Sequence, residues 1–483
     1  MSHPSARPER ASRPGHQGKA IGLAVAAAVG GFLFGFDSSV INGAVDAVEG
    51  EFDLAPVVTG LVVAVALLGS AVGAWAGGRL ADRWGRTRVM LLGAVVFLVS
   101  SILSAAAFAA WDLALWRFLC GIGIGIASVI APAYIAEISP ARLRGRLGSL
   151  QQLAITLGIF AALLSDQVIA TSADGAGEPF WFGWAAWRWM FLVAAVPAVV
   201  YGALALSIPE SPRFLVANGR SDEARRVLER VLPPGEDAGR RVEEITRSVE
   251  EDRANAEGAS LRGPRFGLLP IVWVGILLSV FQQFVGINVI FYYSTTLWQA
   301  VGFDESQSFT VSTITSVTNV LVTFIAIGLV DRVGRRPILL AGSLGMAVSL
   351  GAMAVAFTQA SGSGEDISLS GPWGVVALVG ANAFVVFFGA SWGPLVWVLL
   401  GEMFPNRIRA AALGVAAAAQ WIANFLITVS FPPLLDTFGA AIPYFMYTAF
   451  AVLSFVFVLV RVPETKGMEL EEMHGEAYSR PGR

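Results

Sequence analysis

The chain has 483 residues, of which 55% are apolar and 14% charged, and its formal net charge is −3. Soluble domains carry about 25% charged residues, and a helix needs about 20 apolar residues to cross a bilayer, so the composition indicates a membrane protein with about a dozen spans. The near-neutral charge excludes a basic nucleic-acid binder, and a single cysteine, Cys120, excludes an internal disulfide. All three histidines lie in polar end segments, so we expect no metal site and no cofactor.

Apolar windows predict twelve membrane-spanning helices in two sets of six. The first set covers 20–44, 54–80, 89–110, 113–137, 149–170 and 188–208, and the second covers 267–300, 308–330, 337–358, 372–401, 410–432 and 440–461. The polar stretch between the sets contains 221–230, which has the pattern of an amphipathic helix outside the bilayer. We therefore expect a tail (1–19), a first six-helix half (20–208), a helical linker (209–266), a second half (267–461) and a second tail (462–483).

Arginines gather in the connections on one side of the predicted bundle, and carboxylates gather on the other. Arg83, Arg86 and Arg88 follow the second span, whereas Glu49 and Glu51 follow the first. Because basic loops stay in the cytoplasm, this pattern places the linker and both termini on the cytoplasmic side of the cell membrane.

The two halves repeat each other in sequence. An Asp-Arg-x-Gly-Arg motif begins at Asp82 after the second span and at Asp331 after the eighth, and an acidic residue followed by an arginine ends the fourth and tenth spans. Matching loops on one side indicate a parallel duplication of six helices, with a binding site expected between the halves near the middle of the membrane.

The motifs resemble those of the sugar porters of the major facilitator superfamily, over nearly the whole chain. They are the two Asp-Arg-x-Gly-Arg loops, Pro-Glu-Ser-Pro-Arg at 209–213, Gln282-Gln283 with Gly286-Ile287-Asn288, and Pro-Glu-Thr-Lys-Gly at 463–467. Individual stretches are similar to bacterial glucose permeases and to xylose–proton symporters. The resemblance implies an all-α membrane protein with the major facilitator fold, which carries a sugar.

Asp37 is expected to be the only carboxylate well inside a span, and Arg117 lies at a similar depth in the fourth span. A charge inside the membrane is costly, so each one needs a function or a partner. A guanidinium that approaches or leaves a carboxyl group changes how readily that group holds a proton. We therefore interpret Asp37 as a proton carrier coupled to Arg117, and the resemblance supports this because proton-linked sugar porters have an aspartate here. A static buried ion pair is the alternative.

Uncharged amides in both halves form a second group. They are Gln152, Gln282, Gln283, Asn288, Asn319, Gln420 and Asn424. Amides offer donors and acceptors to sugar hydroxyls, and Gly286 would let the seventh helix bend so that the amides converge. A purely structural role between helices is the alternative. Trp392 is the leading aromatic residue for stacking on a sugar. The resemblance implies that these amides except Asn424 bind the ligand with Trp392, while Phe34 and Trp421 close around it.

Charged residues at the expected cytoplasmic ends of the spans suggest a gate in each half. They are Arg86, Glu137 and Arg144 in the first half, and Arg335, Arg336, Glu402 and Arg409 in the second. The resemblance implies that such a network holds the cytoplasmic side shut. Several exposed ion pairs together can shift a two-state equilibrium, although single pairs are weak. Anchoring by positive loops explains part of the arginine content.

The sequence therefore predicts a monosaccharide:proton symporter of the cell membrane, working by alternating access, with a hexose favoured, glucose first, and a pentose such as xylose possible. A proton-independent sugar uniporter is the first alternative, and a membrane sugar sensor is a remote one. The spans carry no catalytic constellation, so we do not expect an enzyme. The expected partners are a monosaccharide, a proton and the lipid bilayer, with no nucleic acid and a monomeric chain.

Overall fold

The computed structural model describes residues 14–139, 144–232, 236–256, 261–264, 266–299, 302–361, 368–369, 371–404 and 408–464. In this part of the chain twelve helical segments are long and apolar enough to cross a membrane. The remaining regular structure includes a short hairpin of β1 (Ala360–Ser361) and β2 (Ser368–Leu369). The prediction of an all-α membrane protein with twelve spans is confirmed.

The first group of helices contains α1 to α7. These are α1 (Pro14–Phe52), α2 (Pro56–Trp84), α3 (Arg86–Ala105), α4 (Ala110–Ile138), α5 (Arg144–Ala173), α6 (Ala186–Val193) and α7 (Ala195–Ser207), with a 3-10 turn η1 (Trp181–Gly183) between α5 and α6. Glycines let these helices approach closely. A Cβ on Gly121 of α4 would overlap the carbonyl of Ala66 in α2, and one on Gly158 of α5 would overlap the carbonyl of Phe32 in α1.

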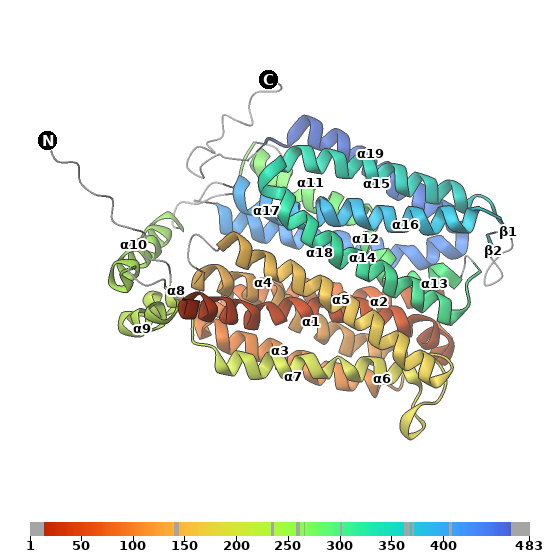
Figure 1. Cartoon of the computed structure of the whole chain (residues 1–483), viewed down its shortest axis with the longest axis horizontal. Coiled ribbons are helices and arrows are strands. Elements are labelled where there is room, and N and C mark those ends of the chain that lie inside the picture. Colours follow the sequence, from red (N-terminus) through yellow and green to blue (C-terminus); the bar gives the residue numbers. More distant parts are fainter. Residues whose placement is uncertain are drawn as a thin grey trace.

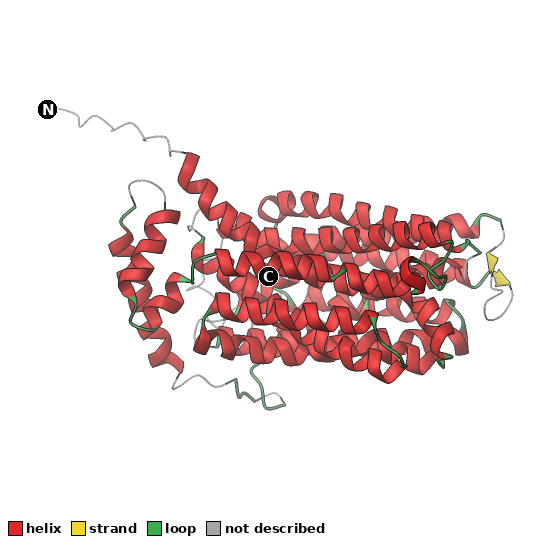
Figure 2. Cartoon of the chain, turned by 90° about the horizontal axis from the view of Figure 1, so that it is seen from below, coloured by secondary structure: helices red, strands yellow, loops and turns green. Residues whose placement is uncertain are grey.

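The linker forms three short helices, α8 (Pro212–Ala217), α9 (Ser221–Val231) and α10 (Ala238–Ala256). The helix expected near 221–230 is α9, and it buries Ala224, Val227, Leu228 and Val231, which lie on one face at helical spacing. All three helices lie at one end of the bundle, and the β1–β2 hairpin lies at the other (Figures 1 and 2). We call these the linker end and the hairpin end.

The second group contains α11 to α19. These are α11 (Pro270–Phe284), α12 (Ile287–Tyr292), α13 (Ser294–Gln299), α14 (Glu305–Val333), α15 (Arg335–Phe357), α16 (Trp373–Ala390), α17 (Trp392–Met403), α18 (Arg409–Phe438) and α19 (Ala441–Arg461). In this group two spans expected as single helices, 267–300 and 372–401, are interrupted. The first breaks at Gly286, whose φ of 82° is in the left-handed region, and the second breaks at Ser391, three residues before Pro394.

The two groups lie side by side with their helices running in the same general direction (Figure 1). In the middle, α2 packs on α18 and α5 packs on α14. Toward the hairpin end, hydrogen bonds join the groups. Asp46 Oδ1 accepts from Thr296 Oγ1 at 2.7 Å, and Gln167 Nε2 donates to Thr310 Oγ1 at 2.9 Å. In this conformation the groups are therefore tied together at the hairpin end.

Candidate functional site

A buried ion pair lies inside the first group, between α1 and α4. Arg117 Nη1 is 2.6 Å from Asp37 Oδ1, and the two side chains are 3% and 4% exposed. Cys120, one turn beyond Arg117 on α4, donates its Sγ–H to the same oxygen at 3.1 Å. The guanidinium carbon of Arg117 lies over the ring of Phe191 on α6, 5.7 Å from the centre of that ring. The structure thus brings together the two charged residues that the sequence could place only at similar depth.

A small cavity beside this pair reaches both groups of helices. Its volume of about 10 Å³ leaves room for about one water molecule. Asp37 and Arg117 line it from the first group, and Tyr292 of α12 lines it from the second. Tyr292 also bonds to Asn424 of α18. A side chain of the second group therefore lies directly beside the charged pair.

Three amides gather around the break between α11 and α12. Gln282 Nε2 donates to the carbonyl oxygens of Trp392 and Gly393 at 2.9 and 3.2 Å, and Asn288 Nδ2 donates to Gln283 Oε1 at 2.5 Å. Gly286 makes this possible, because its left-handed conformation turns Asn288 back toward Gln283. The bend expected from the sequence is present. Through Gln282, the break between α11 and α12 contacts the break between α16 and α17.

Trp392 lies deep in the second group rather than on an open surface. The residue is fully buried, and its indole N–H points to Ser343 Oγ at 2.9 Å and to the carbonyl of Leu339 at 3.2 Å, both on α15. The ring exposes no face in this conformation. A sugar could stack on it only after the surrounding side chains move.

The other predicted ligand-binding residues come from both groups. Phe34 of α1 and Trp421 of α18 meet edge to face, with ring centroids 5.4 Å apart, so this pair bridges the two groups. Gln152 is half-buried on α5, and Asn319 is 7% exposed on α14 with its amide oxygen close to Gly389. Gln420 of α18 has a buried amide oxygen that has no hydrogen-bond partner among the described residues. Such an oxygen is an acceptor available to a ligand hydroxyl.

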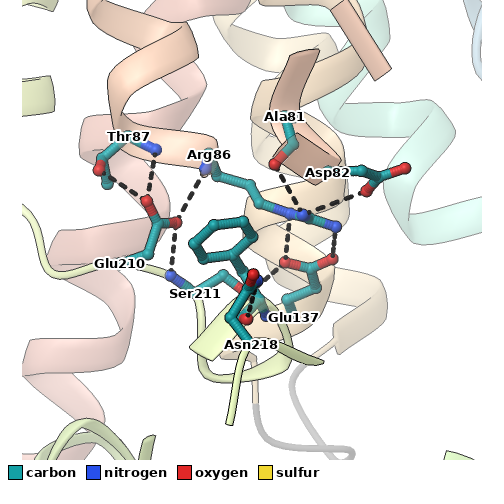
Figure 3. Close-up of polar contacts among 9 residues, drawn as sticks. Ala81, Asp82, Arg86, Thr87, Glu137, Glu210, Ser211 and Asn218 are labelled. Carbon is teal, nitrogen blue, oxygen red and sulfur yellow. Dashed lines mark hydrogen bonds and ion pairs between the residues drawn. The ribbon is translucent and has the colours of Figure 1, made fainter. Parts of the chain in front are cut away.

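At the linker end, Arg86 makes a two-pronged ion pair with Glu137 (Figure 3). Its Nε and Nη2 donate to the two carboxylate oxygens at 3.1 and 3.0 Å. Asp82 lies 3.2 Å from the same guanidinium, and Ser211 donates its hydroxyl to Glu137. The pair ties the α2–α3 turn to the end of α4 and the start of the linker, all in the first group or directly after it.

The remaining gate residues, which are Arg144 of the first group and those of the second group, are described only in part. The side chains of Arg144, Glu402 and Arg409 lie outside the described residues, so the structure does not test whether they pair. Arg335 and Arg336 begin α15, and their backbone N–H groups donate to Glu464 at 2.9 and 3.1 Å. The Arg336 side chain donates to the carbonyl of Leu459 in α19.

Two glutamates that the sequence did not single out hold equivalent helix starts. Glu210 accepts from the backbone N–H groups of Arg86 and Thr87 at the start of α3, and Glu464 does the same at the start of α15. A carboxylate at a helix N-terminus satisfies free N–H groups and opposes the positive end of the dipole. The signal was present, because both glutamates belong to the Pro-Glu motifs 209–213 and 463–467.

One expectation is wrong. Asp37 is not the only carboxylate well inside a span, because Asp166 of α5 is fully buried within Leu147–Ala173. The sequence offered a signal, since Asp166 lies in the predicted span 149–170, but its closeness to the end of that span concealed its burial.

These features define a class of protein. The chain has two groups of helices, a buried charged pair next to the interface between them, and amides at the breaks in the spans. This is how a secondary transporter with its site between two halves is built.

The comparisons with known proteins agree. The family described as sugar (and other) transporters matches residues 23–477. A glucose transport protein of Synechocystis is 55% identical over 92% of this chain and 95% of its own, and the D-xylose-proton symporter of Escherichia coli K12 is 34% identical over 93% and 94%. The partially occluded inward-open structure of the xylose transporter XylE from E. coli aligns with a TM-score of 0.80 at 33% identity, covering 93% of this chain and 99% of that one.

The chain therefore belongs to the sugar transporter family, and its fold is that of the major facilitator superfamily. It is a multi-pass membrane protein, and its relatives are transporters rather than enzymes.

Proposed function

We propose that the protein imports a hexose, glucose first, together with a proton, by alternating access. The observation that carries the proposal is the Asp37–Arg117 ion pair, buried beside a cavity that the second group also lines. The similarity to a glucose transport protein and to a D-xylose-proton symporter supports both the sugar and the coupling ion.

The proton is carried by Asp37. While Arg117 stays at 2.6 Å, the guanidinium stabilises the ionised carboxylate. If the halves move and the pair separates, an ionised carboxylate without a partner in this apolar surrounding becomes costly, and the group takes up a proton. Tyr292 lines the same cavity and belongs to the broken span that carries the amides, so sugar binding and the charged pair act on the same segment.

The sugar is bound by the neutral side chains between the halves. Gln282, Gln283 and Asn288 supply donors and acceptors at the helix break, and the free oxygen of Gln420 adds an acceptor. Gln152 and Asn319 complete the polar lining, and Phe34 with Trp421 covers the site. Trp392 stacks on the sugar once the side chains around its ring move. An uncharged site of this kind recognises hydroxyl groups without removing water from an ion.

The linker end faces the cytoplasm in this proposal, and both termini with it. Arginines at 83, 86 and 88 lie at the linker end, as basic loops of the cytoplasmic side do. The Arg86–Glu137 pair and its counterparts around Arg144, Arg335, Arg336, Glu402 and Arg409 act there as the cytoplasmic gate. A single chain in the lipid bilayer suffices for this cycle, since both halves are present in one polypeptide.

The decisive experiment measures sugar and proton movement with the purified protein in liposomes. Labelled glucose should exchange by counterflow, competed by unlabelled sugars in an order that identifies the substrate, and an imposed inward pH gradient should drive accumulation. Asp37→Asn should keep counterflow and lose accumulation, because the amide cannot release a proton. If the wild type never concentrates any sugar under a pH gradient, the protein is a passive carrier and the coupling is refuted.

A further inference from the structure

Asp166 is a buried carboxyl group that the transport mechanism above does not use. It is 0% exposed, and within the described part of the chain neither of its oxygens makes a hydrogen bond of normal geometry, although the backbone of Gly43 lies beside them. It lies on α5 seven residues before the helix ends at Ala173, which is about 10 Å from the hairpin end of that helix at 1.5 Å per residue. A carboxyl group so placed must have a reason, because burying a polar group without partners is unfavourable.

The carboxyl group is packed against the backbone of α1. A Cβ built on Gly43 would be 2.7 Å from Asp166 Cβ and 2.8 Å from Oδ2, so only glycine fits opposite it. Gly43 lies six residues beyond Asp37 on the same helix, about 9 Å nearer the hairpin end. Asp166 is therefore separate from the Asp37–Arg117 pair, although Asp166 contacts the helix that carries Asp37.

The residues next to this contact hold the hairpin end closed. Asn42, which precedes Gly43, accepts hydrogen bonds through Oδ1 from the backbone N–H of Thr295 at 3.1 Å and from Ser294 at 3.3 Å. Gln167, which follows Asp166, bonds to Thr310 and Thr313 of α14 at 2.9 and 2.8 Å. The Asp166–Gly43 contact thus lies between the two places where α1 and α5 bind the second group.

Several charged and titratable groups on the helices that pack on α5 have partners other than Asp166. On α1 and α4, Asp37 pairs with Arg117 and Cys120, and Asp46 of α1 accepts from Thr296 and Gln299. On α6, Arg188 pairs with Glu51, and at the start of α14, Glu305 accepts from the backbone N–H of Ala176. None of the ion pairs among the described residues includes Asp166, so its surroundings favour an uncharged carboxyl group.

We propose that Asp166 is a second proton-binding site, which is protonated when the hairpin end is closed and gives up its proton when that end opens. In the closed form the protonated group packs on Gly43, and α1 and α5 stay together with their bonds to the second group. Opening admits water, the proton leaves to the solvent and the ionised carboxylate then resists closure, because a charge cannot return unpaired to this contact. This inference rests on the proposed alternating-access function and adds pH control of the outer gate.

The test measures opening of the hairpin end as a function of pH. The reporter is Ser312→Cys, since Ser312 is 1% exposed on α14 and bonds to Ser294 in the closed form. A membrane-impermeant maleimide is applied to intact cells at external pH 5.5 and pH 8, and labelling of the chain without the reporter is subtracted. The same reporter in the Asp166→Asn variant corrects for the pH dependence of the thiol chemistry itself.

The quantity compared is the labelling rate of the reporter protein that keeps Asp166, divided by the rate of the reporter protein that carries Asp166→Asn. We expect this ratio to rise at least ~3-fold from pH 5.5 to pH 8, since the population of open molecules follows ionisation. Asp166→Ser, a second uncharged variant, should behave as Asp166→Asn. A ratio that does not change with pH overturns the proposal. If Asp166→Asn does not fold, by size-exclusion profile, the comparison is made with Asp166→Ser alone.

Two further arms separate this proposal from the transport function. Asp166→Asn should still accumulate sugar under a pH gradient, because Asp37 is intact. Asp37→Asn should lose accumulation and keep the pH-dependent labelling. If the labelling effect disappears in Asp37→Asn, the pH sensor is Asp37 and the assignment of Asp166 is refuted, whatever the outcome for coupling.

Discussion

The stability of the Asp37–Arg117 pair can be tested by removing its members one at a time and together. Asp37→Ala leaves a guanidinium that is 3% exposed without its counter-ion, and Cys120 loses its acceptor. Removing one partner of a buried pair costs about 3–5 kcal/mol, and the low exposure means that no discount for solvent applies. If the first group of helices unfolds as one unit, this loss lowers the unfolding midpoint by roughly 6–20 °C.

The matched comparison is the double variant Asp37→Ala with Arg117→Leu. Because the unpaired charge is gone, the double variant should recover most of the loss, and the coupling energy between the two sites should exceed about 2 kcal/mol. Thermal unfolding of the purified protein in detergent, followed by tryptophan fluorescence, measures all four proteins of the cycle. A cost below about 1 kcal/mol for Asp37→Ala, or a double variant as unstable as the sum of the single ones, would show that the pair is not desolvated as described.

Three further outcomes are expected. Gly158→Ala drives a methyl group into a carbonyl of α1 and should sharply reduce folded protein in the membrane. A Cβ on Gly148 of the same helix would lie more than 4 Å from the described atoms of other segments, so Gly148→Ala should be neutral or slightly stabilising; both are measured by size-exclusion chromatography. Trp392→Phe loses the indole N–H bonds and should cost about 1–2 kcal/mol of stability while weakening glucose affinity by calorimetry, and an unchanged affinity would separate Trp392 from the sugar site. Glu137→Gln removes the charge that holds Arg86, so a cysteine introduced at the linker end should react faster with a reagent added from the cytoplasmic face; equal rates would argue against a gate there.

The number of membrane spans and their helical type were predictable because each span is a long apolar run. The breaks were predicted only in part. Gly286 was expected to bend its span, and the structure has a left-handed residue there, whereas the break at Ser391 was not predicted, although Pro394 follows three residues later. The sequence pattern shows which residues fit a membrane helix. It does not show that the carbonyl of Gly393, at the start of α17, accepts a hydrogen bond from Gln282.

For the site, the sequence identified residue types but not their partners. Asp37 and Arg117 could be matched by depth. The hydrogen bond from Cys120 to Asp37 could not be predicted, because it depends on how α4 is rotated against α1. Trp392 was expected to present its face to a ligand, but it is fully buried and donates to Ser343, which is 49 residues away in the chain. Asp166 was overlooked because burial near the end of a span depends on the neighbouring helix, here on Gly43.

The two capping glutamates have a mechanical consequence. Glu210 follows the last helix of the first group and binds the start of α3, the third span of that group. Glu464 follows the last helix of the second group and binds the start of α15, the third span there. Gly85 and Gly334, with φ of 97° and 108°, precede these two helix starts. In each set of six spans, the segment after the last helix is thereby hydrogen-bonded to the start of the third. These bonds oppose sliding of helices within each group. The motion that opens the site to one side and then to the other is therefore a rotation of the two groups against each other.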